Sequence, residues 1–283
     1  MNILMIGAHP DDCELRGSGL ARKYVLDGHR VRFLSMTDGS GGHQTMKPEA
    51  LKTRRRREAQ AAAEVLGIEY VIWDVPDGSL QATVENREKL IREIRTFKPD
   101  AVFCHRTNDY HPDHRNCGLL VQDAAYLIIV PNFCPDTPAP RKNPVVFFYD
   151  DSFSNPEFCP DAVVAIDDVL EDKFRMLHEH TSQVYEWLPY TACKENEVPA
   201  DEEARFIWLH GDPVTEETTD EIVLGDALQG YSRRFALPAA KYREKLIARY
   251  GEAGKKVRFA EAFQVSEYGT QPSPEELRTL IPY

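Results

Sequence analysis

Two short clusters of His, Pro and Asp are the residues of this sequence best suited to metal chemistry. The first runs from His9 through Pro10 and Asp11 to Asp12. An imidazole and a carboxylate three residues apart can converge on one point, and both are ligands for a borderline divalent ion. In a purely structural interpretation Asp11 would cap a helix and His9 would be a hydrogen-bonded loop histidine. That interpretation accounts for only one of the two carboxylates.

The second cluster, Asp109-Tyr110-His111-Pro112-Asp113-His114, repeats the order His-Pro-Asp. A catalytic zinc site usually has three protein ligands and one open position. One of the two histidines in this cluster would complete such a set with His9 and Asp12, and the other would be free for proton or charge transfer. The structural alternative is a pair of surface histidines beside a capping aspartate.

Alternating strands and helices are predicted to position these clusters. Apolar runs predict strands at Asn2–Ala8, Arg30–Met36, Tyr70–Trp73, Ala101–Cys104 and Val145–Tyr149, and amphipathic spacing predicts helices at Asp12–Leu26, Ala50–Leu66, Val84–Phe97 and Asp113–Leu127. This alternation indicates an α/β fold, with a Rossmann-like, mostly parallel sheet and helices on both faces. Open sheets of this kind bind ligands beyond the carboxyl ends of their strands.

Polar residues follow four of the predicted strands. They are His9 to Asp12 after the first strand, Thr37 and Asp38 after the second, Asp74 and Asp77 after the third, and His105 to His114 after the fourth. Because the carboxyl ends of parallel strands meet at the same edge of a sheet, we predict that the four groups form one site.

The chain is predicted to be one domain, residues 1–283, with a core over about 1–185 and a C-terminal extension over about 186–283. No internal repeat or Gly- and Ser-rich linker divides it. Residues 189–203 and 211–220 are expected to be exposed loops, and the C-terminal part is predicted to complete the sheet and the pocket. The aromatic segments Tyr185-Glu186-Trp187 and Phe206-Ile207-Trp208 are expected to be mainly buried, with stacking on a sugar ring as the alternative.

Composition argues against several classes of protein. The net charge of −12 is unfavourable for binding nucleic acid, and the basic run Arg54 to Arg57 is too short to reverse it. No apolar stretch approaches the roughly 18–20 residues that span a membrane, and we expect a cytoplasmic protein. The six cysteines are scattered and are expected to be free thiols. Cys13 lies among carboxylates that disfavour a thiolate, so we do not expect covalent catalysis.

On these residues the sequence resembles the LmbE-like (PIG-L) family of zinc-dependent deacetylases, which includes N-acetylglucosaminyl-phosphatidylinositol de-N-acetylases. The resemblance covers roughly residues 2–185 and depends mainly on the two His-Pro-Asp clusters. Supporting segments are Glu14, Gly19, Thr37-Asp38-Gly39, Glu58, Ala62-Ala63, Leu66-Gly67, Pro76-Asp77-Gly78 and, more weakly, His180 to Gln183 and Ala260 to Phe263. The resemblance implies one Zn²⁺ per chain, or another divalent ion, held by His9, Asp12 and His114.

The resemblance also implies roles for the remaining polar residues of the clusters. Asp11 would be the general base that activates the attacking water. His111, oriented by Asp113, would stabilise the oxyanion and is a candidate for protonating the leaving amine. An Asp113 carboxylate beside it would favour the imidazolium form of His111.

An arginine of the second helix contacts the substrate in such enzymes. Four consecutive arginines occur here, and spacing back from Glu58 favours Arg55. Two residues depart from the family pattern, since Cys13 replaces a frequent acidic residue and Arg16 replaces a usual small one. The second change is expected to alter the substrate pocket.

Together these features predict a metal-dependent hydrolase that removes an N-acetyl group from an amino-sugar substrate such as an N-acetylglucosamine derivative. The alternatives are a metal-dependent amidase acting on a non-acetyl conjugate and a non-catalytic ligand-binding protein of the same fold. A two-metal phosphoesterase would need more bridging carboxylates, and a dinucleotide enzyme would need a Gly-x-Gly-x-x-Gly turn after the first strand. The sequence leaves open the N-acyl substrate, the native metal and whether the chain forms a homo-oligomer.

Overall fold

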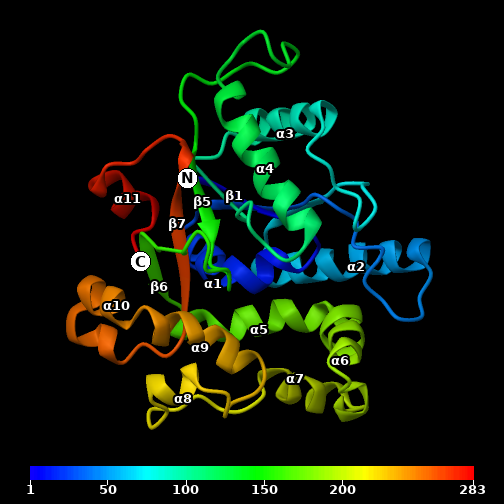
Figure 1. Cartoon of the computed structure of the whole chain (residues 1–283), viewed down its shortest axis with the longest axis vertical. Coiled ribbons are helices and arrows are strands. Elements are labelled where there is room, and N and C mark those ends of the chain that lie inside the picture. Colours follow the sequence, from blue (N-terminus) through cyan, green and yellow to red (C-terminus); the bar gives the residue numbers. More distant parts are fainter.

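A seven-stranded sheet organises the chain in the computed structural model, which describes residues 1–283 (Figure 1). Its strands are β1 (Asn2–Gly7), β2 (Arg30–Ser35), β3 (Glu69–Ile72), β4 (Ala101–Cys104), β5 (Val145–Tyr149), β6 (Ala162–Ala165) and β7 (Ala260–Gly269). Their order in the sheet is β3-β2-β1-β4-β5-β7-β6, and β7 alone runs antiparallel to its neighbours. The sheet is therefore mostly parallel, as predicted.

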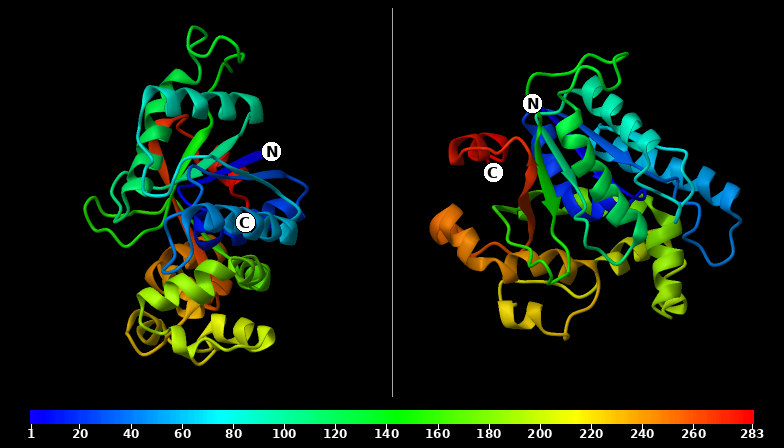
Figure 2. Two further views of the ribbon diagram at one scale, coloured as in Figure 1. Left: turned by 90° about the vertical axis from the view of Figure 1, so that its right-hand side faces the viewer. Right: turned by 45° about the horizontal axis from the view of Figure 1, so that its top comes forward.

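Helices connect the strands and extend beyond them. The α-helices are α1 (Asp12–Leu26), α2 (Pro48–Leu66), α3 (Val84–Phe97), α4 (Pro112–Leu127), α5 (Leu170–Glu179), α6 (Leu188–Thr191), α7 (Glu202–His210), α8 (Asp220–Leu224), α9 (Tyr231–Lys241), α10 (Arg243–Tyr250) and α11 (Pro274–Leu280). Short 3₁₀ turns occur at η1 (Asp167–Val169), η3 (Glu195–Glu197) and η4 (Gly251–Lys255), and η2 (Ser182–Trp187) is a π-helical segment. Figure 2 shows from two further directions that helices α5 to α10 gather at the end of the molecule opposite α3.

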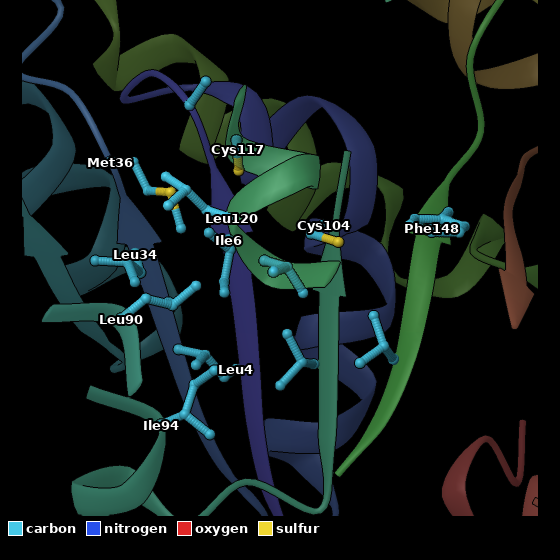
Figure 3. Packing of buried hydrophobic residues seen from close by; sticks show 14 of the residues in the cluster. Leu4, Ile6, Leu34, Met36, Leu90, Ile94, Cys104, Cys117, Leu120 and Phe148 are labelled. Atoms are coloured by element: carbon cyan, nitrogen blue, oxygen red, sulfur yellow. The ribbon is translucent and has the colours of Figure 1, made fainter. Parts of the chain in front are cut away.

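Helices α3 and α4 cover one face of the sheet. Leu90 of α3 and Leu120 of α4 are fully buried against apolar strand residues that include Ile6 and Leu34 (Figure 3). Burying a side chain of this size contributes about 1.5–3 kcal/mol. The packing fixes α4 on the sheet, and with it the position of the polar residues in its first turn.

Helices α1, α2 and α5 cover the other face. Ala59, Ala62 and Leu66 of α2 face a core that also holds Leu20 of α1, and their spacing places them on one side of the helix. Arg55 lies one turn before Ala59 on the same side and is also buried. Because the apolar side of α2 faces the sheet, Arg55 on that side also points toward the sheet.

The predicted elements are confirmed, with ends that differ by up to two residues: α2 begins at Pro48 and α4 at Pro112. The predicted loop at 189–203 is wrong in part, because α6, η3 and the start of α7 lie there. The C-terminal part does complete the sheet, since β7 lies between β5 and β6. All six cysteines are free, and Cys159 and Cys193 are the exposed ones.

The strand order creates a crevice at one edge of the sheet. From β1 the chain runs outward to β2 and β3, and it then returns to form β4 on the other side of β1. The loops after β1 and β4 therefore diverge, and this switch in direction is where open α/β sheets bind ligands. None of the helices combines the length and the apolar character that a membrane span requires.

Candidate metal centre and active site

The loop after β1 and the first turn of α4 bring the two His-Pro-Asp clusters together. Strand β1 ends at Gly7, where an added Cβ would lie 2.7 Å from Cβ of Asp12. A glycine at this position therefore leaves room for Asp12 to fold back over the strand end. From α4, His114 approaches the same point, and its side chain is almost completely buried.

His9, Asp12 and His114 lie within 3.6 Å of one another. His9 Nδ1 lies 3.2 Å from His114 Nε2 and 3.6 Å from Asp12 Oδ2, and His114 Nε2 lies 3.4 Å from Asp12 Oδ1. Ligands 2.0–2.2 Å from a tetrahedral ion are roughly 3.3–3.6 Å apart. The three predicted ligand residues therefore lie together, but His9 and His114 approach different oxygens of Asp12. Where His114 is included, the groups whose ligand atoms lie close enough to share one ion combine it either with His9 and His111 or with Asp12 and His105. The set of His9, Asp12 and His114 as the metal ligands stays a prediction.

Each ligand histidine is oriented by a carboxylate on its other ring nitrogen. His9 Nε2 lies 3.1 Å from Asp113 Oδ2 and 3.2 Å from Asp77 Oδ1. His114 Nδ1 lies 2.9 Å from Asp109 Oδ1. Carboxylate–histidine pairs of this kind fix the ring and the tautomer of metal ligands. Sequence analysis gave no role to Asp109, although its place in the second cluster was a signal.

The charge of this cluster also fits a cation. Asp12, Asp77, Asp109 and Asp113 form no ion pair with a lysine or arginine, and their only ion-pair partners are histidines. Burial opposes ionisation of Asp12, but the neighbouring histidines leave its pKa well below the ordinary value. Buried carboxylates that lack cationic side chains are costly unless a metal ion or protonated histidines neutralise them.

His105 is a further histidine of the site to which sequence analysis gave no role. It follows β4, its ring stacks on His114 with centroids 4.1 Å apart, and its Nε2 lies 3.1 Å from Asp12 Oδ2. Burial and the charge of His114 lower the pKa of His105 to about 4, so its ring is neutral. His105 therefore packs against His114 and Asp12 as an uncharged polar side chain.

Asp11 precedes α1 but does not act as its cap. Its side chain accepts no capping hydrogen bond, and its φ of 141° is unusual for a residue other than glycine. Asp11 Oδ2 lies 3.1 Å from Nη2 of Arg55, in the lining of the cavity beside the ligands. Burial raises the pKa of Asp11, and Arg55 opposes that shift. The carboxylate can therefore accept a proton more readily than a surface aspartate does.

Of the four consecutive arginines, Arg55 is the one that reaches the site. It donates hydrogen bonds to the carbonyl oxygens of Pro10 and Gly39 and pairs with Asp11. Gly39 has a φ of +65°, and a Cβ there would lie 2.4 Å from the Arg55 guanidinium. The predicted contact of Arg55 with substrate stays a prediction, because the contacts found are with the protein.

His111 lies at the N-terminus of α4 and faces the cavity. Its Nδ1 accepts a hydrogen bond of 3.2 Å from the backbone N–H of Asp113. Nδ1 is therefore unprotonated, and the hydrogen of a neutral His111 ring sits on Nε2. Burial, followed by the charges of His9 and His114, lowers the pKa of His111.

The predicted pair between the Asp113 carboxylate and the His111 ring is not found. The carboxylate instead accepts hydrogen bonds from the backbone N–H groups of Gly78 (2.7 Å) and Leu80 (3.0 Å), besides its contact with His9. These two donors belong to the turn after β3. Their contact with α4 depends on the tertiary structure and could not be predicted from the sequence.

The Asp113 carboxylate lies within 4.8 Å of a His111 ring nitrogen without a hydrogen bond to it, and its charge raises the pKa of His111. Burial and the charges of His9 and His114 outweigh this effect, so the pKa of His111 is lowered. The imidazolium role of His111 stays a prediction.

A cavity of about 580 Å³ opens in front of these residues. Its wall includes Gly41 and Gly42 of the loop after β2, Gln183 and Trp187 of η2, and Arg234 of α9. π-Helical segments such as η2 occur frequently at functional sites. Trp187 is thus the residue of the two aromatic segments that can meet a ligand in this cavity.

The other rim residues predicted for the site have different positions. Asp38 is buried and accepts hydrogen bonds from the backbone N–H groups of Ser40 and Asp77, so it shapes two loops. Asp74 is exposed and pairs with Lys52 outside the cavity. Three of the four predicted groups therefore contribute side chains to the site. The group after β3 contributes only Asp77, and the group after β2 contributes none.

A buried network supports α1 from below the site. His180 Nε2 lies 2.8 Å from Glu14 Oε1, and both side chains are fully buried. Lys173 donates to the carbonyl oxygen of Glu14 and to Glu261, whose other contacts are backbone N–H groups of α1. The weak sequence signals at His180 and Glu261 thus mark residues that hold α1 in place.

Comparisons with known proteins agree with this geometry. Residues 4–125 match the family model described as PIG-L: GlcNAc-PI de-N-acetylase, and this range contains both clusters. The chain is 32% identical to a diacetylchitobiose deacetylase of Thermococcus kodakarensis in a 204-residue alignment that covers 66% of this chain and 74% of the relative. It is 26% identical to a 4-oxalmesaconate hydratase of Pseudomonas putida in a 196-residue alignment that covers 66% of this chain and 76% of the relative.

Among solved structures, N,N′-diacetylchitobiose deacetylase from Pyrococcus horikoshii has a similar fold. The TM-score is 0.67 at 23% identity, and the match covers 94% of this chain and 83% of that one. The structural similarity therefore extends beyond residues 4–125, the range of the family model.

Proposed function

The chain belongs to the PIG-L (LmbE-like) family, and from this premise we propose that it is a metal-dependent hydrolase that removes the N-acetyl group of an amino-sugar substrate. One observation carries the proposal: His9, Asp12 and His114 lie within 3.6 Å of one another, a carboxylate braces each histidine, and Asp11 lies beside them in the same cavity. A protein that only bound a ligand would have no use for a carboxylate base at this place.

His9, Asp12 and His114 would hold one divalent ion. We propose zinc, because two imidazoles and one carboxylate form a known catalytic donor set for that metal. When bound, the ion would polarise the acyl carbonyl and lower the pKa of water in its open position toward about 7.

Asp11 would act as the general base for the attacking water. Its raised pKa favours acceptance of a proton, and Arg55 holds the carboxylate in the wall of the cavity. The proton that Asp11 accepts is then available for the departing nitrogen. No covalent intermediate is needed, and burial together with Glu14 and Asp12 raises the pKa of the Cys13 thiol well above its usual value.

His111 would stabilise the negative charge that develops on the carbonyl oxygen. With Nδ1 occupied by the backbone N–H of Asp113, Nε2–H is the donor left for the substrate. A neutral ring suffices for this role, and the lowered pKa of His111 supports it. His111 is also the second candidate for protonating the leaving amine.

The relatives support an amino-sugar substrate. The similar enzyme of T. kodakarensis is named for the deacetylation of diacetylchitobiose. In this chain Trp187 offers an aromatic wall of the kind that stacks on sugar rings, and Gln183 beside it offers amide hydrogen-bonding groups.

Hydration of an unsaturated acid is the second candidate function. The chain is 26% identical to a 4-oxalmesaconate hydratase over 76% of that relative, and addition of water to a double bond could use the same metal ligands and base. The two functions differ in product, because only deacetylation releases an amine.

The test is an assay of purified protein reloaded with Zn²⁺ after chelation. We expect free amine from N,N′-diacetylchitobiose or N-acetylglucosamine, detected with an amine-reactive fluorophore, and none from the chelated protein. Asp11→Asn serves as the control that keeps the ligands. Metal-loaded protein that releases no amine from any N-acetyl sugar, but consumes 4-oxalmesaconate, would replace the first proposal by the second.

A further inference from the structure

The active-site cavity contains two arginines that no protein carboxylate neutralises. We propose that Arg16 of α1 and Arg234 of α9 form an anion subsite, so that the substrate carries a carboxylate or phosphate group in addition to the group that reacts. The identity of the reacting group rests on the proposed function, whereas the subsite itself does not.

Arg16 lies one turn after Asp12 on α1 and lines the cavity. Its Nη1 donates a hydrogen bond of 2.6 Å to the backbone carbonyl oxygen of Asp150. Neither Nε nor Nη2 donates to any protein group, and the arginine forms no ion pair within 4.0 Å. One hydrogen bond therefore holds the guanidinium while its other donors stay available.

Arg234 of α9 lines the same cavity and has fewer protein partners than Arg16. Its side chain makes no hydrogen bond and no ion pair, and its only contact with a polarisable group is the Tyr231 ring, 5.8 Å from Cζ. Arg16 and Arg234 also line a second, smaller cavity together, which places the two side chains beside each other. After desolvation, the charge of Arg16 is the next cause that lowers the pKa of Arg234.

The acidic groups nearby have other partners. Asp11 pairs with Arg55, and Glu261 pairs with Lys173 at 2.6 Å. Asp150 accepts a hydrogen bond from a tyrosine hydroxyl and forms no ion pair with Arg16. Burial raises the pKa of its carboxyl group, and the charges of Lys241 and Arg16 oppose that shift. The chain has 46 acidic and 34 basic residues, so a shortage of acids does not explain two unpaired arginines in one cavity.

An oxyanion is the ligand that this arrangement recognises. A guanidinium donates two parallel hydrogen bonds to a carboxylate or a phosphate, and two guanidiniums can share one such group. The cavity of about 580 Å³ is within the range that holds a small organic ligand. A substrate can therefore reach the metal ligands with its reacting group while its anionic group lies between α1 and α9.

The first test compares substrates that differ in charge. Zn²⁺-loaded protein is assayed with N-acetylglucosamine, its 6-phosphate, and N-acetylmuramic acid, which carries a carboxylate. We expect kcat/KM to be higher for an anionic substrate, and the KM of that substrate to rise roughly 10-fold or more in Arg234→Gln, which loses no hydrogen bond or ion pair within the protein. The KM of the neutral sugar should change much less, and the exposed Arg278→Gln is the control. Which of the two anionic sugars is preferred distinguishes phosphate from carboxylate.

The second test does not depend on turnover. Binding of inorganic phosphate and of succinate to the metal-loaded full chain is measured by calorimetry in wild type, Arg16→Gln, Arg16→Lys and Arg234→Gln. We expect both Gln variants to bind about 10-fold more weakly or worse, with Arg16→Lys between them and wild type. Urea unfolding of each variant confirms that it is folded.

The outcomes separate the two proposals. Anion binding or anionic turnover that is equal in wild type and both Gln variants would overturn the subsite, because anions would then bind at the metal alone. Arginine-dependent anion binding without release of amine from any N-acetyl compound would leave the subsite in place and reject the deacetylase. Amine release from neutral sugars only, with no arginine dependence, would reject the subsite and leave the hydrolase.

Discussion

Asp113→Asn is the substitution that best separates the structure from the sequence-based assignment of roles. The sequence suggested that Asp113 orients His111, whereas its carboxylate contacts His9, a proposed metal ligand, and two backbone N–H groups. We therefore expect the substitution to weaken metal binding and to lower stability, with a smaller effect on the pKa of His111, because the charge of Asp113 is a lesser cause there than burial and the charges of His9 and His114.

The magnitude follows from the hydrogen bonds. Oδ2 accepts from His9 and Gly78 and Oδ1 accepts from Leu80, so an asparagine oxygen can replace only one of the two sides. With the oxygen toward His9 and Gly78, the amide NH₂ faces the buried N–H of Leu80, and an unsatisfied buried donor costs about 1–3 kcal/mol of stability. The bond to His9 changes from charge-assisted to neutral, a loss of about 1–1.5 kcal/mol, which corresponds to roughly 5- to 12-fold weaker metal binding.

The assay is a Zn²⁺ titration against a chromogenic chelator, together with urea unfolding in the presence of EDTA. Asp77→Asn is the matched control, because Asp77 also approaches His9 Nε2 (3.2 Å) but accepts only one backbone bond, from Gly41. We expect both variants to lose metal affinity and only Asp113→Asn to lose much stability. If Asp113→Asn keeps wild-type metal affinity and shifts the pH profile of kcat, this reasoning is refuted. Asp113 would then act mainly on the protonation of His111, as the sequence suggested.

Three further outcomes are expected. His114→Ala should be isolated without metal, since two protein ligands are too few, and elemental analysis showing one ion per chain would contradict the ligand set. Asp11→Asn should retain the ion and lose about 10²-fold or more in kcat, measured as amine release, because asparagine cannot accept the proton. The third outcome concerns pH: burial opposes protonation of His180, but Glu14 leaves its pKa raised above 6.5. The stability from this pair should be full below about pH 6.5 and lost as the pH rises through the folded pKa. In metal-free protein the free energy of unfolding of wild type should thus approach that of His180→Gln at alkaline pH, and a parallel pH dependence of the two would exclude the effect.

The order of elements in the first half of this protein could be predicted because local patterns specify it. Strand β4 at Ala101–Cys104 and helix α3 at Val84–Phe97 were predicted with the ends that the structure has, since apolar runs and amphipathic spacing are properties of neighbouring residues. The meeting of His9, Asp12 and His114 was predicted as well. His9 and Asp12 share one turn of chain, and the family resemblance indicated His114 within the repeated His-Pro-Asp cluster. That these three residues bind the metal stays a prediction.

The helices after residue 188 were predicted less well. Segments α6 (Leu188–Thr191) and η3 (Glu195–Glu197) are short and contain Pro and acidic residues, so their local pattern resembles a loop. Such segments become helical through contacts made elsewhere in the chain, which a local pattern does not contain.

The sequence indicated the residues that we propose for the chemistry, and the tertiary structure decided which of them lie in contact. Asp113 pairs with His9 rather than His111 because the turn after β3 presents the N–H groups of Gly78 and Leu80 to its carboxylate. Arg234 and Arg16 line the same cavity although 218 positions separate them in the chain, because α9 packs against strand β7, which also contacts α1. Side-chain partners across such distances depend on how the sheet and its covering helices pack together, and no local spacing encodes that packing.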